Sequence, residues 1–232
     1  MGIDVTTAEL KRQQKESGVD HVIIIPFPST AIANNSINIR LLDETRKVNT
    51  FSPYHYIREN YDTDGFDPIP DSYFGGKWHW MRGVQDSSSN YRVLEDENLP
   101  GLTEKIRNTG KPVIFEEELE FTKRFVDMFP GITLIIPHLG LLGGFPLDFL
   151  RAFKNKDNVY FDTALGSQDM ISEFVRAIGP QRVIFGSDVP FGTMRGELSK
   201  VAGLSLGASD KELILSGNII RLAHPCVQIK HQ

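Results

Sequence analysis

Three stretches decide the fold: TLIIPHLG (133–140), NVYFDTALG (158–166) and RVIFGSD (182–188). Each contains a continuous run of apolar, mostly β-branched or aromatic residues. Continuous runs, unlike alternating ones, are typical of strands that are buried on both faces, as in a parallel sheet. The stretches therefore predict three neighbouring strands of one parallel sheet.

Four similar runs occur earlier in the chain: HVIIIPF (21–27), TFSPYHYI (50–57), GGKWHWM (75–81) and PVIFEEE (112–118). Most successive runs start about 20 to 35 residues apart, roughly the length of one strand–helix unit. Segments of helical character lie between or around them, and we expect helices over residues 6–17, 99–108, 118–129, 167–178 and 210–223. Residues 60–74 and 85–98 are predicted to be loops because Asp, Pro, Gly or Ser dominate them.

Alternating strands and helices leave two architectures open, a doubly wound sheet and a (β/α)8 TIM-type barrel. No Gly-rich phosphate-binding loop follows any strand, which disfavours the doubly wound alternative. Seven strands are predicted where a complete barrel has eight, and only Met1–Val5 precedes the first helix. We therefore predict one domain over residues 1–232, a TIM-type barrel whose first strand is missing or very short. An exposed sheet edge has unpaired backbone groups that can pair with another chain. We therefore expect the edges to be covered by Met1–Val5, by the first helix or by another subunit.

The first helix carries its own boundary signals. Thr7 is a candidate N-cap and Gly18 a candidate C-cap. Trp78 and Trp80, which flank His79, are expected to serve the packing of the barrel and not to form a stacking platform for a ligand.

Composition excludes several classes of protein. The 232 residues are 40% hydrophobic and 24% charged, with a formal net charge of -5, which gives no positive field for nucleic acid. No apolar run approaches the roughly 20 residues that span a bilayer. Cys226 is the only cysteine, so no intrachain disulfide can form. These features predict a cytoplasmic protein that binds neither nucleic acid nor a membrane, and they leave a homo-oligomer open.

Ionisable side chains stand at the ends of several predicted strands, where parallel β/α proteins carry their chemistry. Burying one charge there is costly without a partner, so several such groups indicate a shared polar site. The candidates are Lys77, His79, Glu116, His138, Asp162 and Asp188. Arg82 and Arg195 also follow strand ends and are candidates for binding a substrate carboxylate.

Each candidate also has an ordinary structural interpretation. A histidine at a strand end is often only a hydrogen-bonded structural residue, and Ser187-Asp188 can cap the helix that follows. Glu117 and Glu118 are typical of a solvated helix start that is stabilised by the helix dipole. An arginine after a strand often faces solvent.

Taken in order, the motifs resemble those of the amidohydrolase superfamily. PGITLIIPHLG (130–140), NVYFDTALG, RVIFGSDVPFG (182–192) and the closing ELILSGNIIRLAHP (212–225) carry the resemblance, and SGVDHVIIIPFP (17–28) and GGKWHWM extend it over nearly the whole chain. The ordered set is similar to the group that includes aminocarboxymuconate semialdehyde decarboxylase and the pyrone dicarboxylate lactonases.

The resemblance implies a (β/α)8-type barrel that commonly holds one divalent metal, Zn or Mn, at its C-terminal mouth. Carried onto this chain, the metal ligands are Glu116, His138 and Asp188. Glu116 stands where the family typically has histidine. The family's first-strand His-x-His pair has no counterpart, because His21 is the first histidine. Either a first strand is missing from this sequence or the protein naturally opens with its first helix.

The resemblance further implies a hydrolase for a small carboxylated, amide or lactone metabolite. A bound metal would polarise the carbonyl, with Asp188 as general base and His138 stabilising the oxyanion. Lys77 joins the catalytic group, while His79, Arg82 and Asp162 are expected to bind substrate. A metal-free hydrolysis by His138, Asp188 and Lys77 is the second possibility. The competing hypothesis is a catalytically degenerate barrel that binds a ligand or partner, supported by the missing His-x-His pair.

Overall fold

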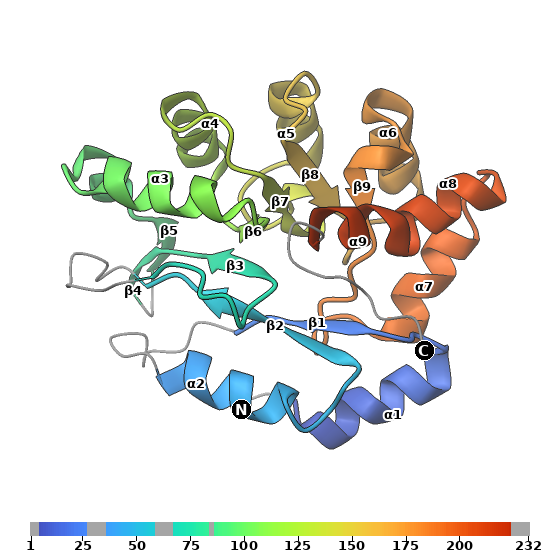
Figure 1. Cartoon of the computed structure of the whole chain (residues 1–232). Coiled ribbons are helices and arrows are strands. Elements are labelled where there is room, and N and C mark those ends of the chain that lie inside the picture. Colours follow the sequence, from blue (N-terminus) through green and yellow to red (C-terminus); the bar gives the residue numbers. More distant parts are fainter. Residues whose placement is uncertain (1–4, 27–35, 59–66, 84–85, 224–232) are drawn as a thin grey trace.

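The computed structural model describes residues 5–26, 36–58, 67–83 and 86–223. Within them the seven predicted strands form one parallel sheet whose order follows the sequence. The sheet is curled into a half barrel, as Figure 1 shows. Its strands are β1 (Val22–Ile24), β2 (Phe51–Tyr56), β3 (Gly75–Trp78), β6 (Val113–Phe115), β7 (Leu134–Ile136), β8 (Val159–Asp162) and β9 (Val183–Ile184). The predicted TIM-type architecture is confirmed, with β1 and β9 at the two edges of the described sheet.

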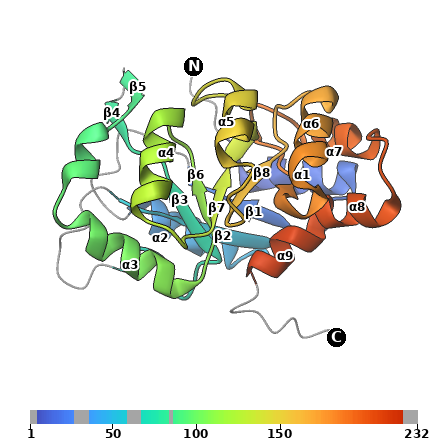
Figure 2. The ribbon, with the colours of Figure 1, turned by 90° about the horizontal axis from the view of Figure 1, so that it is seen from above.

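Most helices lie around the outside of the curved sheet, as seen from above in Figure 2, whereas Ile219 and Leu222 of the last helix pack against the cluster on its inner face. The helices are α1 (Thr7–Ser17), α2 (Ser36–Thr45), α3 (Leu99–Thr109), α4 (Leu119–Met128), α5 (Pro146–Phe153), α6 (Gln168–Ile178), α7 (Met194–Ala202), α8 (Ala208–Glu212) and α9 (Asn218–Ala223). Short helical turns add η1 (Tyr91–Glu95), η2 (Pro137–Gly140), η3 (Pro180–Arg182) and the π-helical η4 (Leu213–Gly217). Among the described residues no helix combines the length and apolar character that crossing a membrane requires.

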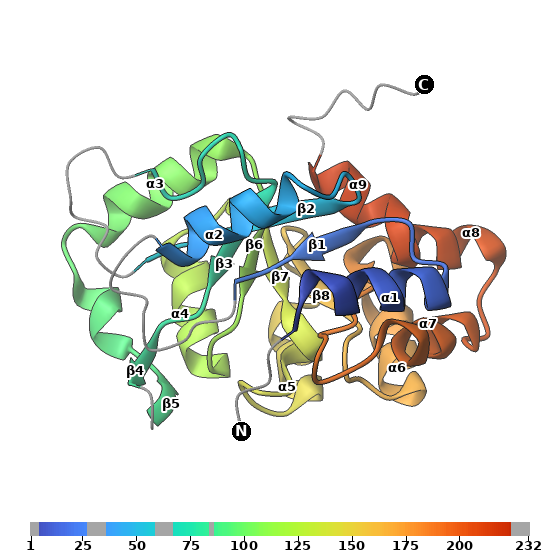
Figure 3. The ribbon, with the colours of Figure 1, turned by 90° about the horizontal axis from the view of Figure 1, so that it is seen from below.

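The first helix of the chain contacts the helix that follows the last strand. Figure 3, seen from below, shows α1 next to α7. The backbone N–H of Met194 donates to Gln13 Oε1 at 3.1 Å, and Arg195 Nη2 donates to the carbonyl of Glu16 at 2.5 Å. The two ends of the open sheet are thus linked through their helices. Residues 1–4 of the proposed first strand lie outside the described residues.

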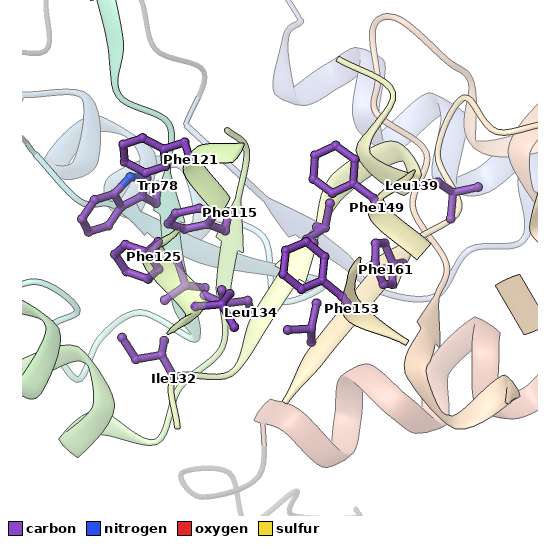
Figure 4. Close-up of a cluster of buried hydrophobic side chains, with 14 of the residues drawn as sticks. Trp78, Phe115, Phe121, Phe125, Ile132, Leu134, Leu139, Phe149, Phe153 and Phe161 are labelled. Carbon is purple, nitrogen blue, oxygen red and sulfur yellow. The ribbon is translucent and has the colours of Figure 1, made fainter. Parts of the chain in front are cut away.

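The core has two parts because side chains alternate between the faces of each strand. The larger part lies between the sheet and the helices and is rich in aromatic rings, among them Trp78, Phe115 and Phe161 (Figure 4). The rings of Trp78 and Trp80 stack at 3.8 Å between centroids, which confirms their predicted packing role. A smaller cluster lies on the inner face: Tyr54, Ile114, Ile135 and Ile184.

Strand register determines which polar residues share the inner face with that smaller cluster. Lys77 pairs with Ile114 across β3 and β6, and Ile114 pairs with Ile135 across β6 and β7. Paired residues of parallel strands point to the same side of a sheet, so Lys77 points to the inside of the half barrel. The next β8–β9 pairing places Asp162 beside Ile184 on that same face.

Several local predictions need correction. Residues 85–98 are not simply a loop: β5 (Asp86–Ser89) pairs antiparallel with β4 (Met81–Gly83), and η1 follows. Thr6, not Thr7, caps α1 by accepting from the N–H of Glu9, whereas Gly18 is the C-cap as predicted, with φ 75°. The closing helix predicted over 210–223 is interrupted by the π-helical turn.

Candidate active site

The polar residues predicted at strand ends come from five neighbouring strands. Lys77 belongs to β3, and Glu116 directly follows β6. His138 lies in η2 just after β7, Asp162 ends β8, and Asp188 follows β9. Because parallel strands present their carboxyl ends at one edge of the sheet, these side chains gather at the C-terminal mouth of the barrel.

A buried ion pair between Lys77 and Glu116 lies at the centre of this group. Lys77 Nζ donates to Glu116 Oε2, and their side chains are only 6% and 15% exposed. Burial raises the pKa of Glu116, but the charge of Lys77 and the hydrogen bond with His138 outweigh burial and hold that pKa well below its usual range. Glu116 is therefore a carboxylate and Lys77 has the partner that a buried ammonium requires.

Two histidines contact opposite parts of Glu116. His138 Nε2 lies 3.4 Å from Glu116 Oε1, so the two carboxylate oxygens face different cations or donors. His79 Nδ1 lies 2.6 Å from the backbone oxygen of Glu116, and since a carbonyl only accepts, Nδ1 is the donor. Burial lowers the pKa of His79, which favours its neutral form. His79 is therefore fixed to the backbone of the strand end.

Asp162 holds the backbone of the neighbouring strand end. Its Oδ1 accepts from the N–H of His138 at 2.8 Å and from the N–H of Ala164 at 2.9 Å. Burial raises the pKa of this carboxyl, against the opposing effect of His138. These contacts give Asp162 a positioning role for His138, in addition to the substrate contact predicted from the sequence.

Asp162→Ala is expected to lower the free energy of unfolding by about 1–3 kcal/mol, because two N–H groups lose their acceptor. It is also expected to lower kcat, since His138 loses the contact that fixes its backbone. Asp162→Asn keeps an oxygen at the same position and should retain most of both quantities. Urea unfolding and steady-state kinetics of the two variants check this, and equal behaviour of Ala and Asn would contradict it.

The backbone at these strand ends adopts a left-handed conformation. Among the described residues, the non-glycine positions with positive φ are His138 (40°), Leu139 (57°), Leu165 (57°) and Asp188 (43°). All follow β7, β8 or β9. Such conformations cost on the order of 1–3 kcal/mol each and concentrate at functional sites. The strain thus coincides with the two residues, His138 and Asp188, that the sequence singles out for catalysis.

Asp188 is electrostatically coupled to the rest of the group. Burial raises the pKa of Asp188 to about 6, His138 opposes the rise, and Asp162 and Glu116 add to it. Its side chain remains partly accessible, whereas His138 is 5% exposed. A partly accessible carboxylate with a pKa near neutrality is suited to proton transfer.

The structure describes the remaining candidates, two arginines and a glutamate, less fully or places them in other contacts. Arg82 lies in β4, and its side chain is outside what the structure describes. Arg195 is tied to the backbone of Glu16 in α1. Glu117 was interpreted as part of a solvated helix start, and this is wrong: it is buried and accepts from the N–H of Trp80 at 2.5 Å. Burial raises the pKa of Glu117 to about 8, a change that only its three-dimensional surroundings reveal.

The donor set does not fit the metal that the resemblance implies. Within the described part of the chain, no three His, Cys, Asp or Glu side chains are grouped so that they could hold a metal ion. Glu116 and His138 lie together, but Asp188 does not complete the predicted trio. The Lys77 ammonium is also paired with the Glu116 carboxylate, and its positive charge would repel a metal cation there.

Solved structures share this fold. A 2,6-dihydroxybenzoate decarboxylase from Rhizobium matches with a TM-score of 0.72 at 15% identity, covering 95% of this chain and 88% of its own. A dihydroxybenzoic acid decarboxylase from a Polaromonas species, with bound manganese and 2-nitroresorcinol, gives 0.71 at 14% identity, with 95% and 86% covered. A zinc-bound amidohydrolase from Burkholderia multivorans gives 0.74 at 15% identity, with 95% and 88% covered.

At such low identity these structures establish the architecture alone, and no curated protein matches the sequence. A family model supplies the assignment. The model described as Amidohydrolase matches residues 90–222, more than half of the chain, from η1 through α9. The matched region includes Glu116, His138, Asp162 and Asp188. Because this model matches more than half of the sequence, the chain belongs to the amidohydrolase family.

Proposed function

We propose that this protein hydrolyses an ester, lactone or amide bond in a small carboxylated metabolite. The observation that carries the proposal is the group formed by Lys77, Glu116, His138 and Asp188 at one edge of the sheet. It combines a base of suitable pKa with two groups that can stabilise negative charge. Membership of the amidohydrolase family supports an enzyme, and the named dihydroxybenzoate decarboxylases of the same fold support a carboxylated substrate.

Asp188 is the general base in this proposal. With a pKa of about 6 it is mainly ionised at neutral pH, yet it is a stronger base than an ordinary aspartate. It removes a proton from a water molecule as the water oxygen bonds to the substrate carbonyl carbon. When the intermediate collapses, the carbon–heteroatom bond breaks and the leaving oxygen or nitrogen takes the proton back from Asp188.

Lys77 and His138 stabilise the oxyanion that forms on the carbonyl oxygen. An ammonium has three N–H donors, and one of those on Lys77 is used by Glu116. The others remain for the oxyanion or a substrate carboxylate. The Glu116 carboxylate keeps both Lys77 and His138 oriented through its two oxygens. Loss of a single donor of this kind typically lowers kcat by about 10²–10³-fold.

A screen of carboxylated lactones, esters and amides tests the proposal, with the carboxylate product of each reaction measured by liquid chromatography. We expect turnover of at least one compound by the wild type and turnover at least about 100-fold slower by Asp188→Asn. Turnover that is unchanged in Asp188→Asn, or none by the wild type across all three bond classes, would count against hydrolysis at this site.

Decarboxylation is the second candidate. The pKa of about 6 also leaves part of Asp188 protonated near neutral pH, and a protonated Asp188 could deliver its proton to the substrate carbon as CO₂ departs. The decarboxylases of the same fold make this alternative specific. Incubation with hydroxylated benzoic acids, monitored for CO₂ release, separates it from hydrolysis, which releases no CO₂.

The pH dependence follows from the role of Asp188 as a base. Only the ionised form accepts a proton, so kcat/KM for hydrolysis should fall about tenfold for each pH unit below about 6 and level off above it. A pH profile of the wild type between pH 4.5 and about 8 measures this. Activity that stays constant down to pH 4.5 would exclude Asp188 as the base.

A further inference from the structure

We infer that the Lys77 ammonium takes the place of a divalent metal ion, so that this barrel works without one. The inference concerns the site of the proposed function. It is tested by metal binding, so its failure and the failure of that function can be told apart.

The Lys77 side chain ends beside a carboxylate that the resemblance implies as a metal ligand. Lys77 points to the inner face of the half barrel, level with Ile114, and its ammonium contacts the carboxylate that follows β6. Glu116 is one of the three residues, with His138 and Asp188, that the resemblance implies as metal ligands. One of its oxygens is used by Lys77 and the other faces His138, so a metal would have to displace existing partners of the carboxylate.

The charges of Lys77 and Glu116 also disfavour a divalent metal ion at this place. Lys77 and Glu116 compensate one another in a setting where neither side chain is more than 15% exposed. A divalent cation beside them would meet a buried ammonium, and like charges held this close with little water disfavour one another strongly. Adding the metal would therefore require Lys77 to lose its proton or move.

Burial alone does not distinguish Lys77 from every other lysine of this chain. Lys111 is also buried, but its Nζ donates to the backbone carbonyl of Pro70 at 3.0 Å and lies 3.6 Å from the exposed Asp71. Neither of these two contacts involves a histidine or a buried carboxylate. Lys111 is thus a matched control, a buried lysine whose carboxylate partner is exposed to solvent, unlike Glu116.

The experiment is a calorimetric titration with MnCl₂ and ZnCl₂ after treatment with a chelator and dialysis. We expect the wild type to show no metal binding that depends on Glu116, measured as the difference from Glu116→Gln. Lys77→Met removes the ammonium and leaves Glu116 and His138 side by side, and we expect it to bind metal at least tenfold more tightly than the wild type. The double variant Lys77→Met/Glu116→Gln should lose that gain, and Lys111→Met should show none.

Two results would overturn the inference: one equivalent of metal bound by the wild type and lost in Glu116→Gln, or a folded Lys77→Met that gains no affinity. Circular dichroism establishes whether Lys77→Met is folded. If it is not, the wild-type titration decides alone: Glu116-dependent binding refutes the inference, and its absence supports it.

Discussion

Asp188→Asn is expected to lower kcat by about 10²–10⁴-fold and to change the midpoint of thermal unfolding little. The amide cannot take the proton of the attacking water, so the hydrolytic step loses its base. Asparagine suits the position because the backbone at Asp188 has φ 43°, a conformation that Asn adopts more readily than Ala. Alanine would add backbone strain to the loss of the carboxylate.

Asp127→Asn is the control for this prediction. Asp127 lies in α4, is exposed, and pairs with Lys156 at 3.0 Å on the outside of the barrel. Its amide variant should keep wild-type kcat and unfolding. Kinetics on any substrate found in the screen, together with a thermal melt of each variant, make the comparison. If Asp188→Asn retained more than half of the wild-type kcat, the catalytic role assigned to Asp188 would be wrong.

Glu116→Ala is expected to lower the free energy of unfolding by about 3–5 kcal/mol. The reason is that Lys77, only 6% exposed, loses its carboxylate partner and remains as an uncompensated buried charge. Turnover should fall as well, since Lys77 and His138 both lose the group that orients them. Urea unfolding monitored by tryptophan fluorescence measures the loss of stability.

The matched control is Glu120→Ala on α4. Glu120 also pairs with a lysine, Lys123, at 2.8 Å, but the two side chains are 62% and 45% exposed. Exposed ion pairs contribute about 0–1 kcal/mol, so this variant should unfold almost as the wild type does. If Glu116→Ala and Glu120→Ala lowered the free energy of unfolding by similar amounts, the buried Lys77–Glu116 pair would contribute no more to stability than an exposed pair.

Much of the fold could be predicted because each strand is a continuous apolar run. All seven runs became strands of the parallel sheet in the predicted order. Helices with clear caps were also found, such as α6, which begins after the capping Ser167. Helices α2, α5 and α7 were not predicted; α5 has no side-chain cap, but Thr193 caps α7, so a cap alone does not determine which helices the sequence reveals. Polar sequence in residues 85–98 likewise concealed the hairpin of β4 and β5, because its pairing is not visible as an apolar pattern.

The candidate site was predicted at the level of which strand ends meet, but not at the level of contacts. Parallel topology places Lys77, Glu116 and His138 at one edge of the sheet, and the structure brings them into contact. That Lys77 pairs with Glu116, while Glu117 turns into the protein to hold Trp80, depends on which of two adjacent side chains faces inward. Three consecutive glutamates give no sign of this difference.

The most direct test of a shared site is the titration of Asp188 followed by ¹³C NMR of its carboxyl carbon, assigned by its loss in Asp188→Asn. We predict a midpoint near pH 6 in the wild type and a higher midpoint in His138→Gln, because His138, which follows β7, lowers the pKa of Asp188, which follows β9. A midpoint near the ordinary aspartate value of about 4, unchanged by the substitution at position 138, would show that the two side chains do not share an environment.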